Sequence, residues 1–82
     1  MNEDTKKQIG ANIRIKREEL GLSQEQLAKS IGKQTATYIA FIEKGERNVT
    51  TVDLMSIAKQ LGTTIASLVG EDKTKKPSVI DA

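Results

Sequence analysis

The chain has 82 residues, enough for one small domain and close to the lower limit for a core without disulfides or metal. It contains no Cys and no His, its net charge is +2, and no apolar run approaches the roughly 18 residues that cross a bilayer. These features exclude a disulfide scaffold, a thiolate metal site and a membrane-spanning segment, and they favour a cytoplasmic protein. So weak a positive charge does not by itself indicate a nucleic-acid partner.

The first predicted element is a helix over about residues 4–20. Its inner face is predicted from Ile9, Ile13 and Leu20, and Gly21 ends it. The helical periodicity is strong here and in the segments that follow, whereas alternation typical of strands is nearly absent. The sequence therefore predicts an all-α fold.

The next segment predicts two short helices, residues 23–31 and 35–44, that meet across a tight turn. Ser23 can cap the first of them, and Gln26 three residues later completes a capping box. Gly32 suits the left-handed conformation that ends a helix. The second helix can leave polar and small side chains facing outward, as a helix that enters a DNA major groove does.

Two further helices are predicted over residues 51–61 and 64–69. Thr50 and Asp53 are a plausible cap pair for the longer one. The inward positions of these helices are predicted to be Val52, Leu54, Ile57, Ala58, Leu61, Ile65 and Leu68.

Five short helices with brief connections predict a compact bundle over residues 1–70. The composition then changes, because residues 71–82 carry many charges, the single Pro and few core residues. We predict a flexible charged tail or linker there. The alternative is that its end begins a further helix, which leads to a further C-terminal domain or a protein partner.

Three segments carry a resemblance to a known family: IGANIRIKREELGLSQEQLA (residues 9–28), YIAFIEKGERN (38–48) and LMSIAKQLGTTIASLVG (54–70). Together they resemble the lambda-repressor-like, XRE-type helix-turn-helix DNA-binding domains. The resemblance implies a compact five-helix lambda-repressor-like bundle containing a helix-turn-helix. One departure is an extra residue between Gly32 and Glu43, which leaves the start of the recognition helix and its base-reading positions open.

The resemblance implies that the helix over residues 35–44 is the recognition helix and inserts into the major groove. With Thr35 as its cap, Ala36 and the Thr37 methyl group suit a thymine methyl group. The base-reading candidates are Gln34, Thr35, Ala36, Thr37 and Phe41. The phosphate-binding candidates are Gln24, Lys33, Tyr38, Lys44, Arg47, Asn48 and Arg14.

Two registers of this helix are equally regular, one with Ile39 and Ile42 inside and one with Tyr38 and Phe41 inside. The IEKG segment, which matches the family, favours the first register and turns Phe41 outward. Tyr38 is interpreted either as a phosphate contact or as a ring packed on the first helix with its hydroxyl at the rim.

A structural ion pair between Arg17 and Glu43 is also implied by the resemblance. In the family, the matching residues form a partly buried pair that joins the first helix to the end of the recognition helix. Breaking such a pair leaves a stranded charge, so we expect it to matter for stability and for DNA affinity.

The predicted function is a sequence-specific, repressor-like transcriptional regulator that binds double-stranded DNA as a homodimer. Candidate dimer surfaces are the loop around Val49, the last helix around Ile65 and Val69, or residues beyond Val79. The alternative is a protein-binding adaptor, such as an antitoxin or coactivator-like module with the same fold. An enzyme is not expected, because the chain lacks His, Cys, a Gly-rich phosphate loop and a carboxylate pair in an evident cleft. No cofactor or metal is expected either.

Overall fold

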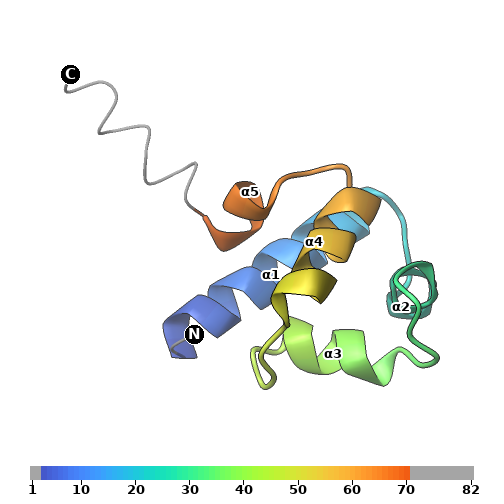
Figure 1. The fold of residues 1–82 in the computed structure, drawn as a ribbon, viewed down its shortest axis with the longest axis horizontal. Helices are drawn as coiled ribbons and strands as arrows, with labels where there is room; N and C mark the ends of the chain where they lie inside the picture. Colours follow the sequence, from blue (N-terminus) through green and yellow to red (C-terminus); the bar gives the residue numbers. More distant parts are fainter. Residues whose placement is uncertain (1–2, 71–82) are drawn as a thin grey trace.

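The computed structural model describes residues 3–70, which form five helices (Figure 1). The helices are α1 (Glu3–Glu19), α2 (Gln24–Ser30), α3 (Thr37–Glu43), α4 (Thr51–Gln60) and α5 (Ile65–Val69). The predicted all-α, five-helix architecture is thus confirmed over this part of the chain. None of these helices is long and apolar enough to cross a bilayer. The predicted tail over residues 71–82 lies outside the described residues.

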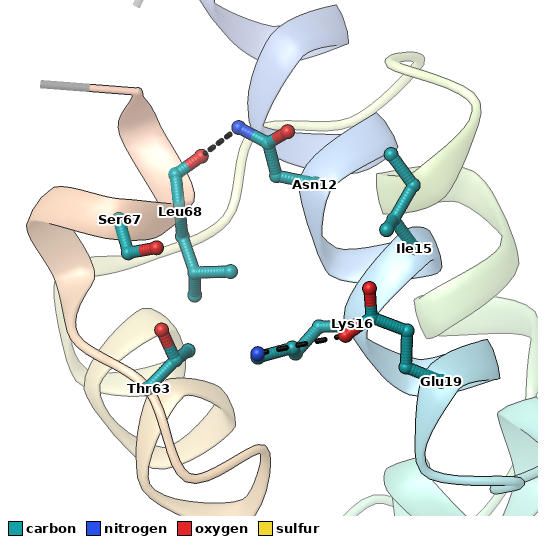
Figure 2. A pocket seen from close by; sticks show the side chains of 7 residues that line it. All are labelled: Asn12, Ile15, Lys16, Glu19, Thr63, Ser67 and Leu68. Atoms are coloured by element: carbon teal, nitrogen blue, oxygen red, sulfur yellow. Dashed lines mark hydrogen bonds and ion pairs between the residues drawn. The ribbon is translucent and has the colours of Figure 1, made fainter. Parts of the chain in front are cut away.

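Helix α1 is the central element of the fold. It packs against α3 on one side and α5 on the other, while α2 contacts both α3 and α4 (Figure 1). The α5 side is joined by a hydrogen bond from Asn12 Nδ2 to the backbone oxygen of Leu68, 2.7 Å long (Figure 2). A small pocket of about 150 Å³ lies beside this bond, away from the α2–α3 pair.

The core draws side chains from all five helices and from the loop before α4. It consists of Ile9, Ile13, Leu27, Ala28, Ile39, Ile42, Val49, Leu54, Ile57, Ala58, Leu61 and Leu68.

Two residues predicted for the core, Leu20 and Val52, are 51% and 71% exposed. Leu20 lies past the end of α1, where the chain has already turned away, and the half-buried Leu22 packs against the core instead. Val52 precedes the buried Leu54 by two positions, a spacing that turns it about 200° away on a helix. Both predictions were therefore wrong.

The predicted helix ends are mostly confirmed, because they depend on residues close together in the chain. Ser23 Oγ accepts from the backbone N–H of Gln26 at 3.0 Å, and Gln26 Oε1 accepts from the Ser23 N–H at 2.7 Å, which completes the capping box. Thr50 Oγ1 likewise accepts from the backbone N–H of Asp53 at 3.1 Å. Gly32 has φ +84°, the left-handed conformation predicted for it.

Gly10 permits a close approach that was not predicted from the sequence. A Cβ atom at this position of α1 would lie 2.1 Å from the backbone oxygen of Ile42 and 2.8 Å from that of Glu43. The backbone of α1 therefore lies directly against the last turn of α3. This contact fixes how α3 sits on the rest of the domain.

Candidate nucleic-acid interface

Helix α3 has one buried side and one exposed side. Ile39 and Ile42 are 0% and 1% exposed, whereas Thr37, Phe41 and Lys44 are exposed. The three exposed residues are spaced i, i+4 and i+7, so they lie on one side of the helix and of the turn that ends it. The structure therefore has the register with the two isoleucines inside, and Phe41 is 41% exposed.

The start of α3 differs from the prediction. The helix begins at Thr37, two residues later than expected, and Ala36 is its N-cap, with no side-chain hydrogen bond. The first helical hydrogen bond runs from the N–H of Ala40 to the oxygen of Ala36, 2.9 Å long. Thr35 is thus not the cap. It is exposed, with Gln34, in the turn before the helix.

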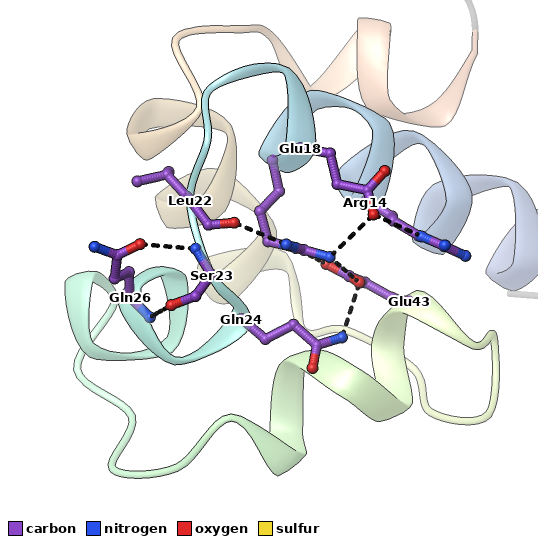
Figure 3. Close-up of polar contacts among 8 residues, drawn as sticks. Arg14, Glu18, Leu22, Ser23, Gln24, Gln26 and Glu43 are labelled. Carbon is purple, nitrogen blue, oxygen red and sulfur yellow. Dashed lines mark hydrogen bonds and ion pairs between the residues drawn. The ribbon is translucent and has the colours of Figure 1, made fainter.

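The other end of α3 is fixed by the predicted partners Arg17 and Glu43 (Figure 3). Arg17 Nε donates to Glu43 Oε2 at 2.7 Å, and Nη2 donates to Oε1 at 3.1 Å. The remaining nitrogen, Nη1, donates to the backbone oxygen of Leu22 at 2.7 Å. The Glu43 side chain is 3% exposed. The hydrogen bond that Arg17 donates to Glu43 raises the pKa of the Arg17 guanidinium.

Gln24 extends this network to the start of α2. Its Nε2 donates to Glu43 Oε1 at 3.0 Å (Figure 3). The amide therefore supports the end of α3, and the suggested contact with phosphate stays a prediction. Arg14, another phosphate candidate, is exposed and pairs with Glu18 at 3.1 Å on the outer side of α1.

A groove of about 280 Å³ lies between the outer side of α1, the start of α2 and α3. It contains charged groups of both signs together with the small side chain of Ala40. Its lining residues are Arg14, Arg17, Glu18, Gln24, Ala40, Glu43 and Lys44.

Lys33, Tyr38, Arg47 and Asp53 form a second polar group, here called the Tyr38 cluster. The Tyr38 hydroxyl donates to Asp53 Oδ2 on α4, and Lys33 Nζ lies 3.4 Å from the same oxygen. Burial first, and then the bond to Asp53, raise the pKa of Tyr38 to about 12. The hydroxyl bond and Lys33 lower the pKa of Asp53.

Asp53 was predicted only as a cap residue, and its contact with Tyr38 was missed. The two residues are 15 positions apart, and no spacing rule connects a residue of one helix to a residue of another. The ring of Tyr38 is half-buried against the core, and its hydroxyl is already paired in the free protein. A contact of Tyr38 with phosphate stays a prediction.

The loop after α3 places further polar side chains beside the exposed face of the helix. Lys44, Arg47 and Asn48 are exposed, and Lys44 Nζ lies 6.0 Å from the centroid of the Phe41 ring. Val49 holds this loop to the core and is only 6% exposed. Its side chain is therefore not available to a partner, and the loop around it stays a predicted dimer surface.

Comparison with known proteins gives one family and several close relatives. A helix-turn-helix family model, HTH_3, matches residues 13–68. The control protein C.SmaI of Serratia marcescens is 42% identical over 66 residues, which cover 80% of this chain and 77% of that protein. The control protein C.MunI of a Mycoplasma species is 36% identical over 69 residues, or 83% of this chain and 92% of that protein.

Among solved structures, the chain is similar to the restriction-modification controller protein C.AhdI from Aeromonas hydrophila. The TM-score is 0.72 with 34% sequence identity, and the match covers 82% of this chain and 98% of that one.

Proposed function

Because the chain belongs to the HTH_3 helix-turn-helix family, we propose that it is a sequence-specific transcriptional regulator that inserts α3 into the major groove of DNA as a homodimer. The family supports the coarse assignment, a DNA-binding helix-turn-helix regulator similar to restriction-modification controller proteins. The relatives are named as control proteins, in agreement with the prediction that the chain is not an enzyme.

The observation that carries this proposal is the division of α3 into two sides. Ile39 and Ile42 hold the helix to the core, which leaves Thr37, Phe41 and Lys44 facing outward. Outward residues of such a helix can reach base edges, while cations at its borders bind the DNA backbone. The cations bordering α3 are Lys33 before it and Lys44 and Arg47 after it.

Base reading is assigned to the exposed residues at the start of α3 and in the turn before it. Thr37 can offer its methyl group to a thymine and its hydroxyl to a base edge or a phosphate. Gln34 can pair with an adenine through its amide, and Phe41 can contact thymine methyl groups or sugars. Backbone contacts supply affinity without sequence information, so salt should weaken binding steeply.

A homodimer is proposed because one recognition helix reads only a few base pairs. Two copies of α3 about 34 Å apart would read two half-sites one helical turn apart. We assign the contact between copies to the surface around α4, where Val52 and Met55 are 71% and 55% exposed at an i, i+3 spacing. Met55→Glu should shift the sedimentation of the protein toward monomer. The control Ile15→Glu, at an equally exposed residue of α1, should not.

The proposed function is tested by selecting bound sequences from random duplexes with the parent chain, Thr37→Ala and Lys44→Ala. Thr37→Ala should relax the preference at one or two positions of the selected site. Lys44→Ala should weaken all sequences alike and reduce the slope of log K against log salt by about 1. If the parent shows no salt-sensitive binding to duplex DNA, the regulator assignment is refuted, and the exposed Phe41 would then favour the protein-binding adaptor.

A further inference from the structure

The ring of Tyr38 lies next to two of the cations predicted to bind phosphate. Lys33 Nζ is 4.8 Å from the ring centroid, and Arg47 Cζ is 5.0 Å from it. At this range the negative face of an aromatic ring attracts a cation. Lys33 belongs to the turn before α3 and Arg47 to the loop after it, so the segments at both ends of α3 meet at one side chain.

Two cations this close to one centroid repel each other, and the repulsion must be offset locally. Asp53 supplies one carboxylate, which accepts from the Tyr38 hydroxyl and lies 3.4 Å from Lys33 Nζ. The ring supplies the remaining attraction. One carboxylate against two cations still leaves the Tyr38 cluster with an excess of positive charge, as an anion-binding surface needs.

The two cations keep donors that can bind a ligand. A guanidinium that lies over a ring still presents the N–H groups along its edge, and an ammonium has three donors. No hydrogen bond or ion pair joins the Arg47 guanidinium to another residue within the described range 3–70. The Lys33 ammonium forms an ion pair with Asp53, but 38% of the Lys33 side chain remains exposed.

Long cationic side chains on loops lose rotamer freedom when they bind a phosphate, and a residue that orders them beforehand reduces that cost. We propose that Tyr38 is a positioning residue whose ring holds Lys33 and Arg47 as one pair, directed at neighbouring phosphates of a single DNA strand beside the recognition helix. The inference rests on the proposed function, and it assigns to Tyr38 an effect exerted through the two cations, without a contact of its own with DNA.

The test is a double-mutant cycle on the affinity for a fixed duplex at low salt, with the full chain. Tyr38→Leu should weaken the parent about tenfold, the effect of losing two cation–ring contacts. In the Lys33→Ala/Arg47→Ala background, the same change should weaken binding by less than about twofold, because the residues through which Tyr38 acts are gone. Tyr38→Phe, which keeps the ring, should stay within about threefold of the parent.

The matched control is the Lys44→Ala background. It also lacks a candidate phosphate cation, but this cation lies over Phe41. In the Lys44→Ala background, Tyr38→Leu should still weaken the affinity for the duplex about tenfold. Equal losses in the parent, in Lys44→Ala and in Lys33→Ala/Arg47→Ala would mean that Tyr38 merely supports the fold of α3, which overturns the proposal.

A second measurement does not depend on a folded Tyr38→Leu variant. In the parent, the ring current of Tyr38 should displace the proton resonances of the Arg47 side chain, and in Tyr38→Phe the displacement should remain. Undisplaced Arg47 resonances would overturn the proposal even if the parent binds DNA. A parent that binds no duplex would instead refute the proposed function.

Discussion

The two ends of α3 are held in different ways. The last turn carries Glu43, which is 3% exposed at the side chain and bonded to both Arg17 and Gln24, and the backbone of Gly10 lies against it. The first turn begins at Ala36 without a side-chain cap, between exposed residues. The end with Glu43 is thus fixed by a polar network and by backbone packing, while the end with Thr37 lacks a cap and is held by Ile39 in the core and by Tyr38.

The largest effect is expected when the fixed end is broken. Glu43→Ala leaves Arg17 without its partner in a poorly solvated site, which should lower the free energy of unfolding by about 3–5 kcal/mol. For a domain of this size, the Tm should fall by more than about 10 °C. Thermal melts followed by circular dichroism would measure the change.

The control for this prediction is Glu25→Ala, because Glu25 pairs with Lys29 in an exposed position, 3.4 Å away, and does not belong to the Arg17 network. Exposed pairs contribute little, so this variant should change the free energy of unfolding by less than about 0.5 kcal/mol. Equal melting temperatures for the two variants would contradict the view that Glu43 fixes the end of α3.

Gly10→Ala tests the same end through packing. The added methyl group would meet the backbone oxygens of Ile42 and Glu43, so α1 and α3 must separate. Overpacking of this kind should lower the free energy of unfolding by about 1–3 kcal/mol, measured by urea denaturation. Helix propensity alone predicts the opposite sign, a gain of about 1 kcal/mol for Ala over Gly.

The neighbouring Ala11, which is exposed on the same helix, provides the control. Ala11→Gly should follow propensity and lower the free energy of unfolding by about 1 kcal/mol. If Gly10→Ala turns out to be stabilising, the close approach of α1 to α3 is not present in solution.

The difference between the two ends also explains what could be predicted from the sequence. The capping box of Ser23 involves residues within three positions of each other, so spacing rules suffice to find it. The Arg17–Glu43 pair was implied by a family motif. The late start at Ala36 and the bond from Tyr38 to Asp53 depend on how α3 and α4 pack, and no local pattern of residue types specifies that arrangement.

The start of α3 can be probed through the titration of Tyr38, which is the single Tyr in a chain without Trp. Its pKa is raised to about 12 in the folded protein, against about 10 unfolded. The fold therefore favours the neutral phenol of Tyr38. The contribution of this preference to the free energy of unfolding is fully present below pH 10. Between pH 10 and about 12 only the unfolded chain loses the proton, so the stability should fall with rising pH. Phenolate absorbance would measure the pKa directly.

Asp53→Ala separates the causes of the raised pKa of Tyr38. It removes the hydrogen bond and the charge that contribute to the raised pKa, but not the burial, which is the largest cause. The pKa of Tyr38 should drop and still remain above 10. A folded parent that titrates near 10 would show that the hydroxyl is not bonded to Asp53 and that the start of α3 is not held from α4.

The smallest expected effect compares a capped helix start with an uncapped one. Ser23→Ala removes a cap whose backbone, at φ −83° and ψ 163°, is extended, and it should cost about 1 kcal/mol. Ala36→Ser adds a hydroxyl at the start of α3, but Ala36 has φ −71° and ψ −14°, a helical conformation from which Ser does not make a normal cap. The gain should therefore be less than about 0.5 kcal/mol, measured by urea denaturation. A gain near 1 kcal/mol would mean that residue 36 adopts the extended conformation in solution. The start of α3 would then be fixed like that of α2, and the contrast between the two ends of α3 would no longer hold.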